Sequence, residues 1–160
     1  MTPHTKNLAA ALALLSLTAC DKTPENGALD GMWRLEEMHS RPAGSAAYSE
    51  PRDAATADVY WSFQLKLLDI KSNGTRPDAT PAEVMARFTH TGGTLSVTST
   101  YLHGRSTDTP VTGDTQYNGQ PIDLRPLGLD GCTATFRVVR LDSRRMTLCS
   151  DSDSLLFKKI

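Results

Sequence analysis

This chain of 160 residues lacks most of the features from which a function is usually inferred. It has no basic stripe, so the charge pattern of a nucleic-acid-binding protein is missing. It contains neither a Gly-x-Ser-x-Gly nucleophile elbow nor a phosphate-binding loop, and its histidines do not show the spacing of a metal site. No catalytic constellation is visible, so we expect a function other than catalysis, with no cofactor, no metal and no nucleic-acid partner.

The single long apolar run lies near the N-terminus, from Leu8 to Ala19, after the basic residue Lys6. At about twelve residues it is too short to span a bilayer as a helix, which takes roughly twenty. The stretch Leu17-Thr18-Ala19-Cys20 resembles the bacterial lipobox, which implies cleavage after Ala19 and attachment of lipid to Cys20. The alternative is an ordinary signal peptide in which the cysteine occurs by chance.

This interpretation divides the chain into a signal peptide (1–19), a polar lipidated tether (20–27) and a domain (28–160). It locates the domain in the bacterial cell envelope, outside the cytoplasm and held to a membrane by lipid on Cys20. We expect the outer membrane, although Asp21 resembles the inner-membrane retention signal of enteric bacteria. Loss of Lys6 leaves 16 of the 17 basic residues against 18 acidic ones.

Alternating apolar and polar residues, the pattern of half-buried β-strands, recur along the whole domain, and no segment shows a helical period. Trp33 and Leu35 share one face of a first strand that opens at Gly31. A second predicted strand has an inner face made of Val59, Trp61, Phe63, Leu65 and Leu67.

Two glycines mark the clearest hairpin, because Gly92 and Gly93 tolerate the positive φ that tight turns need. A turn centred there makes three inward-facing pairs, which are Phe88 with Val97, His90 with Leu95, and Ala86 with Ser99. The outer face of this hairpin is rich in hydroxyl groups, as expected for a solvated face, and consists of Thr89, Thr91, Thr94, Ser96 and Thr98.

The C-terminal third predicts a three-strand meander with turns at 142–144 and 150–153. The first turn places two apolar pairs face to face, Val139 and Leu141 against Met146 and Leu148. The second turn places Leu148 opposite Leu155 and Met146 opposite Phe157. The meander therefore has one continuous apolar face.

The meander also bears on the two cysteines of the domain, which lies in a compartment where disulfides persist. With Leu141 opposite Met146, Cys149 faces Val138, six residues from Cys132. That separation is near 20 Å at about 3.3 Å per residue, whereas a disulfide needs Cα atoms within about 7 Å. We therefore expect two free thiols, with a disulfide as the alternative if the strand bends.

Two long polar segments, 39–56 and 104–130, interrupt the strands and are rich in Pro, Gly, Ser and Asp. Loops of such length in a compact domain are usually functional or disordered. We expect one or two short strands between Pro110 and Tyr117, and leave open a short helix inside a loop.

About eight antiparallel strands with one apolar face must close on themselves or pack against a second sheet, because open edges invite aggregation. The sequence therefore predicts an all-β fold, an antiparallel up-and-down barrel of about eight strands. A two-sheet β-sandwich is the structural alternative.

Gly31-x-Trp33 at the start of the first strand resembles the opening motif of the lipocalin and wider calycin barrels. Together with 60–63 and the terminal 155–159, it makes the chain similar to the small lipocalin-like lipoproteins of Bacteroidetes. The resemblance implies that Trp33 plugs the closed end of a barrel under an arginine, for which Arg144 and Arg145 are the candidates. It supplies a fold and little chemistry.

Inner-face residues are the candidates for a ligand site, and the set is Trp61, Phe63, Phe88, His90 and Leu95. His90 lies near a hairpin tip, where we expect the mouth of the barrel and a polar contact to a ligand. The alternative is that the rings fill a close-packed core and His90 is hydrogen-bonded at the rim. His39 and His103 lie near the heads of the two long loops, and Asp151-x-Asp153 reads as a solvated turn.

Two functions remain. The first is a membrane-anchored, non-enzymatic barrel that binds a small apolar ligand inside, or a protein or glycan partner through its long loops. The second is a structural or accessory envelope lipoprotein with a filled core and no small-molecule ligand.

Overall fold

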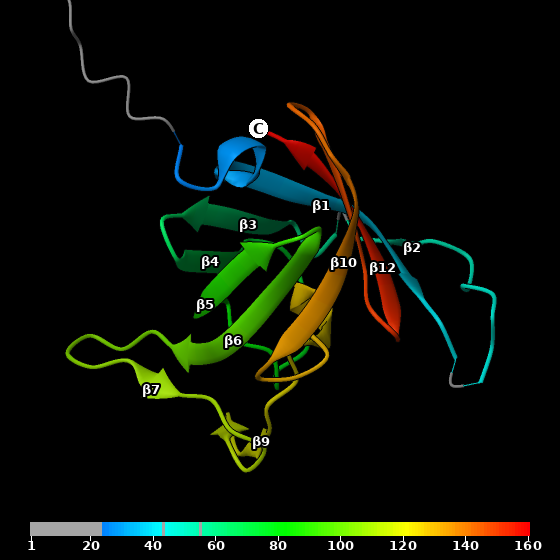
Figure 1. Cartoon of the computed structure of the whole chain (residues 1–160). Helices are drawn as coiled ribbons and strands as arrows, with labels where there is room; N and C mark the ends of the chain where they lie inside the picture. Colours follow the sequence, from blue (N-terminus) through cyan, green and yellow to red (C-terminus); the bar gives the residue numbers. More distant parts are fainter. Residues whose placement is uncertain (1–23, 43, 55) are drawn as a thin grey trace, which may run out of the picture.

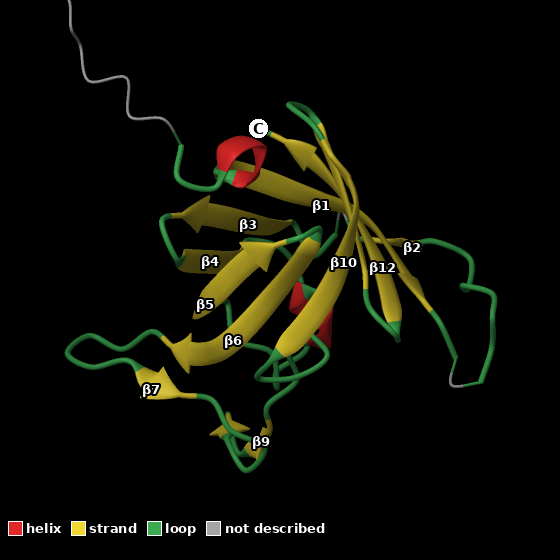
Figure 2. Cartoon of the chain, viewed as in Figure 1, coloured by secondary structure: helices red, strands yellow, loops and turns green. Residues whose placement is uncertain are grey.

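The computed structural model describes residues 24–42, 44–54 and 56–160, and its regular structure is almost entirely β (Figure 1, Figure 2). The predicted signal peptide and Cys20 lie outside the described residues. Eight strands form the main sheet, namely β1 (Gly31–Ser40), β3 (Val59–Gln64), β4 (Leu67–Ser72), β5 (Glu83–Thr91), β6 (Thr94–Leu102), β10 (Ala134–Leu141), β11 (Arg145–Cys149) and β12 (Asp153–Lys159).

These eight strands form a closed barrel. Each is antiparallel to its neighbours in the order β10-β11-β12-β1-β3-β4-β5-β6, and β10 pairs with β6 to complete the circle. Closure removes the unpaired edges that an open eight-stranded sheet would present. The predicted up-and-down barrel is confirmed, and the sandwich alternative is wrong.

Short elements decorate the barrel. Strand β2 (Arg52–Asp53) lies in the first long loop and pairs with β1. The second long loop holds β7 (Thr109–Pro110), which extends the sheet beside β6, and a small separate hairpin of β8 (Gln116–Tyr117) and β9 (Gln120–Pro121). This confirms the short strands expected near Pro110 to Tyr117. The 3-10 turns η1 (Gly27–Leu29) and η2 (Arg125–Leu127) are the described helical segments, and no described helix has the length and hydropathy of a membrane span.

The barrel has two different ends, because consecutive connections of an up-and-down barrel alternate between them. One end, here called the η1 end, holds η1, the C-terminus and the tight turns at 65–66, 92–93 and 142–144 (Figure 1). The opposite end, here called the loop end, holds the connections 41–58, 73–82, 103–133 and 150–152. The two long polar segments predicted from sequence therefore lie at the same end of the barrel.

The apolar faces of the strands converge inside the barrel. Trp33 and Leu35 from β1 are fully buried, and the predicted inner faces of the hairpin and meander supply further residues to the same cluster. Of the hydroxyl-rich face, Thr89, Thr91, Thr94 and Thr98 are exposed. The period-two pattern thus separates the core from the surface as predicted.

The predicted strand over 59–67 is wrong at its end. The chain turns at Leu65 and Lys66 instead, so Leu65 and Leu67 are 59% and 40% exposed, and β4 takes Leu68 and Ile70 inward. Leu65 has a positive φ of 55°, and its carbonyl accepts a hydrogen bond from the side chain of Asn26. That contact crosses 39 residues, so no local pattern marks the turn.

Two bulges shift the predicted registers. Phe88 pairs with Val97 and His90 with Leu95, as expected, but a bulge at Arg87/Phe88 places Ala86 opposite Thr100 and not Ser99. A second bulge pairs Val138 with Leu148, and Val139 is 50% exposed rather than inward-facing. On the strand that carries the extra residue, the residues beyond the bulge change face, whereas the partner strand keeps its alternation.

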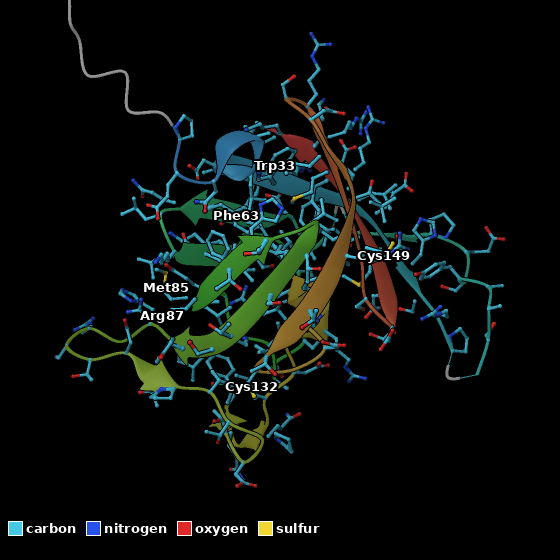
Figure 3. The ribbon with its side chains drawn as sticks, in the orientation of Figure 1. Trp33, Phe63, Met85, Arg87, Cys132 and Cys149 are labelled. Carbon is cyan, nitrogen blue, oxygen red and sulfur yellow. The ribbon has the colours of Figure 1, made fainter. Side chains whose placement is uncertain are left out.

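The remaining pairs of the meander are confirmed. Leu141 lies opposite Met146, Leu148 opposite Leu155, and Met146 opposite Phe157. The thiols of Cys132 and Cys149 are free, as predicted, and Figure 3 shows them well apart. The residue opposite Cys149 is Arg137, because the bulge shifts the expected partner Val138 by one place.

Candidate functional site

Trp33 closes the η1 end of the barrel. Its ring is fully buried, and its indole nitrogen donates a hydrogen bond of 2.8 Å to the carbonyl oxygen of Leu29 in η1. The backbone of η1 therefore covers the tryptophan and satisfies its one polar atom, as a buried tryptophan requires. The plug that the sequence motif implied is present at the described η1 end (Figure 3).

The cation above Trp33 is a lysine, so the expected Arg144 or Arg145 is wrong. The ammonium nitrogen of Lys159 lies 4.8 Å from the centroid of the Trp33 ring and donates a 2.8 Å hydrogen bond to the carbonyl oxygen of Ala28. Arg145 instead pairs with Glu36. Because Trp33 and Lys159 are direct partners across β1 and β12, strand register selects the lysine.

Four of the five predicted ligand residues lie deep in the core. Trp61, Phe63, Phe88 and Leu95 are at most 3% exposed. The ring centroids of Trp61 and Phe63 are 6.1 Å apart, and those of Phe63 and Phe88 are 5.1 Å apart and edge to face. Trp61 also contacts the rings of Phe136 and Phe157. These rings pack against one another along the centre of the barrel.

A segment of the second long loop plugs the loop end. Leu124, Leu127 and Leu129 are at most 4% exposed, and the indole nitrogen of Trp61 donates a 2.8 Å hydrogen bond to the Leu127 carbonyl oxygen. Gly128 has a φ of +91°, and a Cβ built there would lie 3.1 Å from Trp61. The loop backbone thus lies directly against the central tryptophan.

His90 lies at the η1 end, which corrects the expectation that it marks the mouth. It precedes the turn at Gly92 and Gly93, and alternating connections put this turn at the same end as Trp33. Its side chain is half-buried opposite Leu95. Its role as a ligand contact stays a prediction.

The other polar candidates are surface groups. The Nδ1 atom of His103 lies 3.0 Å from a carboxylate oxygen of Asp108, and both side chains are about half exposed. The Nε2 atom of His39 lies 3.3 Å from Glu37, while Glu36 pairs with Arg145. Within the described ranges no group of three or more His, Cys, Asp or Glu side chains is placed to hold a metal ion. Asp151 lies in the β11–β12 turn, and Asp153 is the first residue of β12.

A depression of about 490 Å³ lies at the loop end. Apolar side chains from Val111, Ile122 and Leu124 share it with polar groups, among them the ion pair of Asp123 and Arg125. Hydrogen bonding to Asp123 raises the pKa of Arg125, so the guanidinium stays charged. Mixed apolar and charged lining of this kind suits contact with a macromolecule more than capture of an apolar molecule.

A second depression, of about 590 Å³, lies at the η1 end and is strongly basic. It is lined by residues of the β10–β11 turn and the end of β12, namely Arg140, Asp142, Arg144, Arg145, Lys158 and Lys159. The carboxylate of Asp142 accepts hydrogen bonds from the backbone N–H groups of Arg144 and Arg145 and from Arg140 Nε. These bonds, led by the one from Arg144, hold the pKa of Asp142 at about 2.

Replacing Asp142 with asparagine is expected to destabilise the fold at neutral pH and to have little effect near pH 2. The pKa of Asp142 is lower in the folded protein than its ordinary value of 3.8, so the stabilisation is present above about pH 4 and is lost as the pH falls toward 2. Urea unfolding of both proteins at pH 7, 4 and 2 measures this. A difference that does not change with pH would assign the effect to the turn geometry alone.

Sequence reasoning missed the plug, the strand β4 and the lysine over Trp33. The sequence did contain a signal for the plug, because Leu124, Leu127 and Leu129 stand close together in an otherwise polar loop. The lysine had none, because its position follows from pairing between the first and last strands.

Comparisons with known proteins agree with this architecture. A family model described as a lipocalin-like domain matches residues 14–160. A lipocalin-like protein from Bacteroides uniformis superposes with a TM-score of 0.51 at 17% identity, covering 84% of this chain and all of that one. An uncharacterized protein from Bacteroides eggerthii gives 0.50 at 16% identity, covering 82% and 99%. A search of curated proteins found no match. With its closed eight-stranded barrel and its tryptophan plug, this chain belongs to the lipocalin-like domain family.

Proposed function

We propose that this protein is a membrane-anchored, non-enzymatic lipoprotein that binds a partner macromolecule through the loop end of its barrel. The observation that carries the proposal is the packing of the interior. The rings around Trp61 contact one another, and the segment 124–129 closes over them. An apolar ligand inside would have to displace these side chains, whereas the loop end offers an open depression.

A filled core is also what the alternative function predicts, an accessory envelope lipoprotein without a small-molecule ligand. What favours partner binding is a depression of about 490 Å³ in the second long loop, at the end of the barrel that also holds the first long loop. Protein interfaces combine an apolar centre with polar and charged groups around it, and Ile122 and the Asp123–Arg125 pair provide both.

A non-catalytic function is supported by the surroundings of His103. The pair of His103 and Asp108 is open to water, with side chains 59% and 49% exposed. A general base works best in a site that excludes water and aligns a substrate. Within the described residues, the hydrogen bonds of His103 lead only to Asp108.

Replacing Cys20 with serine tests the anchor. Lipid chains on Cys20 are expected to keep the wild type in the membrane fraction, since each buried methylene contributes about 0.8 kcal/mol. The variant is expected to lose the lipid, which mass spectrometry of the purified protein detects as a missing mass. Wild-type protein that carries no lipid on Cys20 would overturn the anchoring.

Site-specific crosslinking tests the loop end. A photoreactive phenylalanine analogue at Thr112, an exposed residue of the depression, is expected to give a discrete adduct in the native host. The same analogue at Thr98, exposed on the outer wall of the barrel, is the matched control and is expected to give none. Equal adducts at both positions, or a small molecule retained in native mass spectrometry, would contradict binding at the loop end.

A further inference from the structure

Charge is distributed unevenly along the barrel, with the basic residues concentrated at the η1 end. The basic cluster consists of Arg140, Arg144, Arg145, Lys158 and Lys159, with Asp142 and Glu36 as the carboxylates that contact it. Five cations less two carboxylates leave three positive charges. Adding Lys66 from the neighbouring turn, and Glu25 and Asp30 beside η1, still leaves two, six less four.

The loop end carries the opposite sign. Its four connections, 41–58, 73–82, 103–133 and 150–152, contain nine acidic residues and five arginines, which leaves four negative charges, nine less five. The whole chain has a net charge of only −1, so the contrast between the ends is a matter of placement and not of composition. Such a separation orients a protein in the field of a charged surface.

The cluster is built to keep its cations exposed. Asp142 holds the β10–β11 turn through the backbone N–H groups of Arg144 and Arg145, and both of these residues are exposed. Arg144 and Lys158 are exposed, and within the described chain neither has a carboxylate partner. Lys159 is fixed over Trp33 and forms one wall of the depression.

The chain leaves the barrel beside this cluster. The ammonium group of Lys159 donates to the carbonyl oxygen of Ala28 in η1, and Asn26 donates to the carbonyl oxygen of Leu65, so the chain is bound to the η1 end from residue 26 onward. Figure 1 shows the C-terminus next to η1. From residue 20 to residue 24, four residues span at most about 14 Å. A lipid on Cys20 would therefore hold the η1 end close to the membrane surface.

We propose that the basic cluster faces the membrane and binds the phosphate groups of anionic lipids, so that the loop end points away from the surface. This inference rests on the lipid anchor proposed above, and it adds an orientation to it. Basic residues next to a membrane anchor gain from the negative surface potential, and the gain falls off within a Debye length, about 8 Å at physiological salt. The acidic loop end is repelled by the same surface.

Hydrogen exchange of the full-length lipidated protein tests the orientation. Protein is reconstituted on vesicles of phosphatidylcholine alone, or with about one third phosphatidylglycerol, and residues 140–146 and 156–160 are followed by mass spectrometry. We expect exchange in these segments to slow several-fold on the anionic vesicles and to recover in 0.5 M salt, at about which the Debye length falls below 5 Å. Exchange in 112–123 is expected to stay the same on both.

Charge reversal provides the matched variants. Arg144→Glu with Lys158→Glu is expected to abolish the several-fold lipid-dependent protection, and Arg144→Gln with Lys158→Gln to leave part of it. Arg87→Glu with Arg105→Glu makes the same charge change at exposed positions outside the cluster and is expected to keep the protection. Circular dichroism confirms that each variant folds.

The outcomes separate this inference from the anchor. Protein that fails to co-sediment with either type of vesicle removes the anchor itself. Protein that co-sediments with both types, without protection that depends on phosphatidylglycerol, leaves the anchor in place and overturns the orientation. Equal protection by 10 mM inorganic phosphate without vesicles assigns the cluster to a soluble anion and also overturns the proposal.

Discussion

Replacing Trp61 with alanine is expected to lower the free energy of unfolding by about 3–5 kcal/mol, the cost of deleting a large ring from a packed core. Trp61 is fully buried and contacts the rings of Phe63, Phe136 and Phe157. Its indole nitrogen also satisfies the carbonyl oxygen of Leu127 in the plug. The variant therefore loses both the centre of the core and the bond that holds the loop against it. Urea denaturation followed by circular dichroism measures the change.

One further substitution isolates the contribution of the hydrogen bond, and a second serves as a control. Trp61→Phe keeps most of the ring but leaves the Leu127 carbonyl oxygen without its donor, which is expected to cost about 1–3 kcal/mol. Met32→Ala, at a side chain that is 46% exposed on the neighbouring strand, is expected to change stability by less than about 0.5 kcal/mol. A cost below about 1 kcal/mol for Trp61→Ala would mean that the interior is not packed around this ring, and the proposed function would lose its main support.

The second large effect is expected at Gly128, where alanine should destabilise the protein by about 2–4 kcal/mol, from backbone strain and overpacking together. Gly128 has a φ of +91°, and an added Cβ would lie 3.1 Å from a ring carbon of Trp61 and 3.2 Å from a methyl carbon of Leu155. Both neighbours are fully buried, so neither can move without disturbing the core. Thermal or urea unfolding measures the cost.

Gly119 is the matched control for Gly128. It has a similar positive φ of +76° at the tip of the β8–β9 hairpin, but an added Cβ would meet no atom within 4 Å. Gly119→Ala therefore carries the backbone strain without the overlap and is expected to cost about 1 kcal/mol. Equal costs for the two variants would show that the segment 124–129 yields easily and does not act as a rigid plug.

A filled barrel changes what the lipocalin-like fold implies for this protein. Eight-stranded barrels have room for side chains or for one small ligand, and here the rings around Trp61 and the leucines of the plug take that room. The two depressions described above lie at the ends of the barrel, one mixed in character and one basic. Function is therefore proposed at the two ends of the barrel, a partner at one and a membrane at the other.

Strand pairs and turns were predicted correctly where the sequence signal for them is local. The turn at Gly92 and Gly93 set the pairs of Phe88 and His90 correctly, because glycine is needed where φ is positive. The pair of Ala86 failed only two residues further, since β6 carries an extra residue, Thr98, between the partners of Arg87 and Phe88, which no local signal marks. The turn at Leu65 failed for the same reason, because Asn26, far away in sequence, satisfies its carbonyl group.

The candidate site was less predictable than the fold. Alternation correctly selected Trp61, Phe63, Phe88 and Leu95 as inward-facing, but it does not distinguish a lining residue from a packed one. That distinction depends on whether another segment enters the barrel, and here residues 124–129 do. The two ends acquire opposite charges only when distant turns and loops are brought together by closure of the barrel.

The sequence by itself determined an all-β domain and most of its inward-facing residues, because side chains alternate at every step of a strand and turns have local requirements. The tryptophan plug was implied by the resemblance of Gly31-x-Trp33 to a known motif. Tertiary structure alone decided where the bulges fall, that Lys159 covers Trp33, and that residues 124–129 of a mainly polar loop close the loop end of the barrel. These features depend on contacts between segments far apart in the chain, whose positions become defined only when β10 pairs with β6 and the barrel closes.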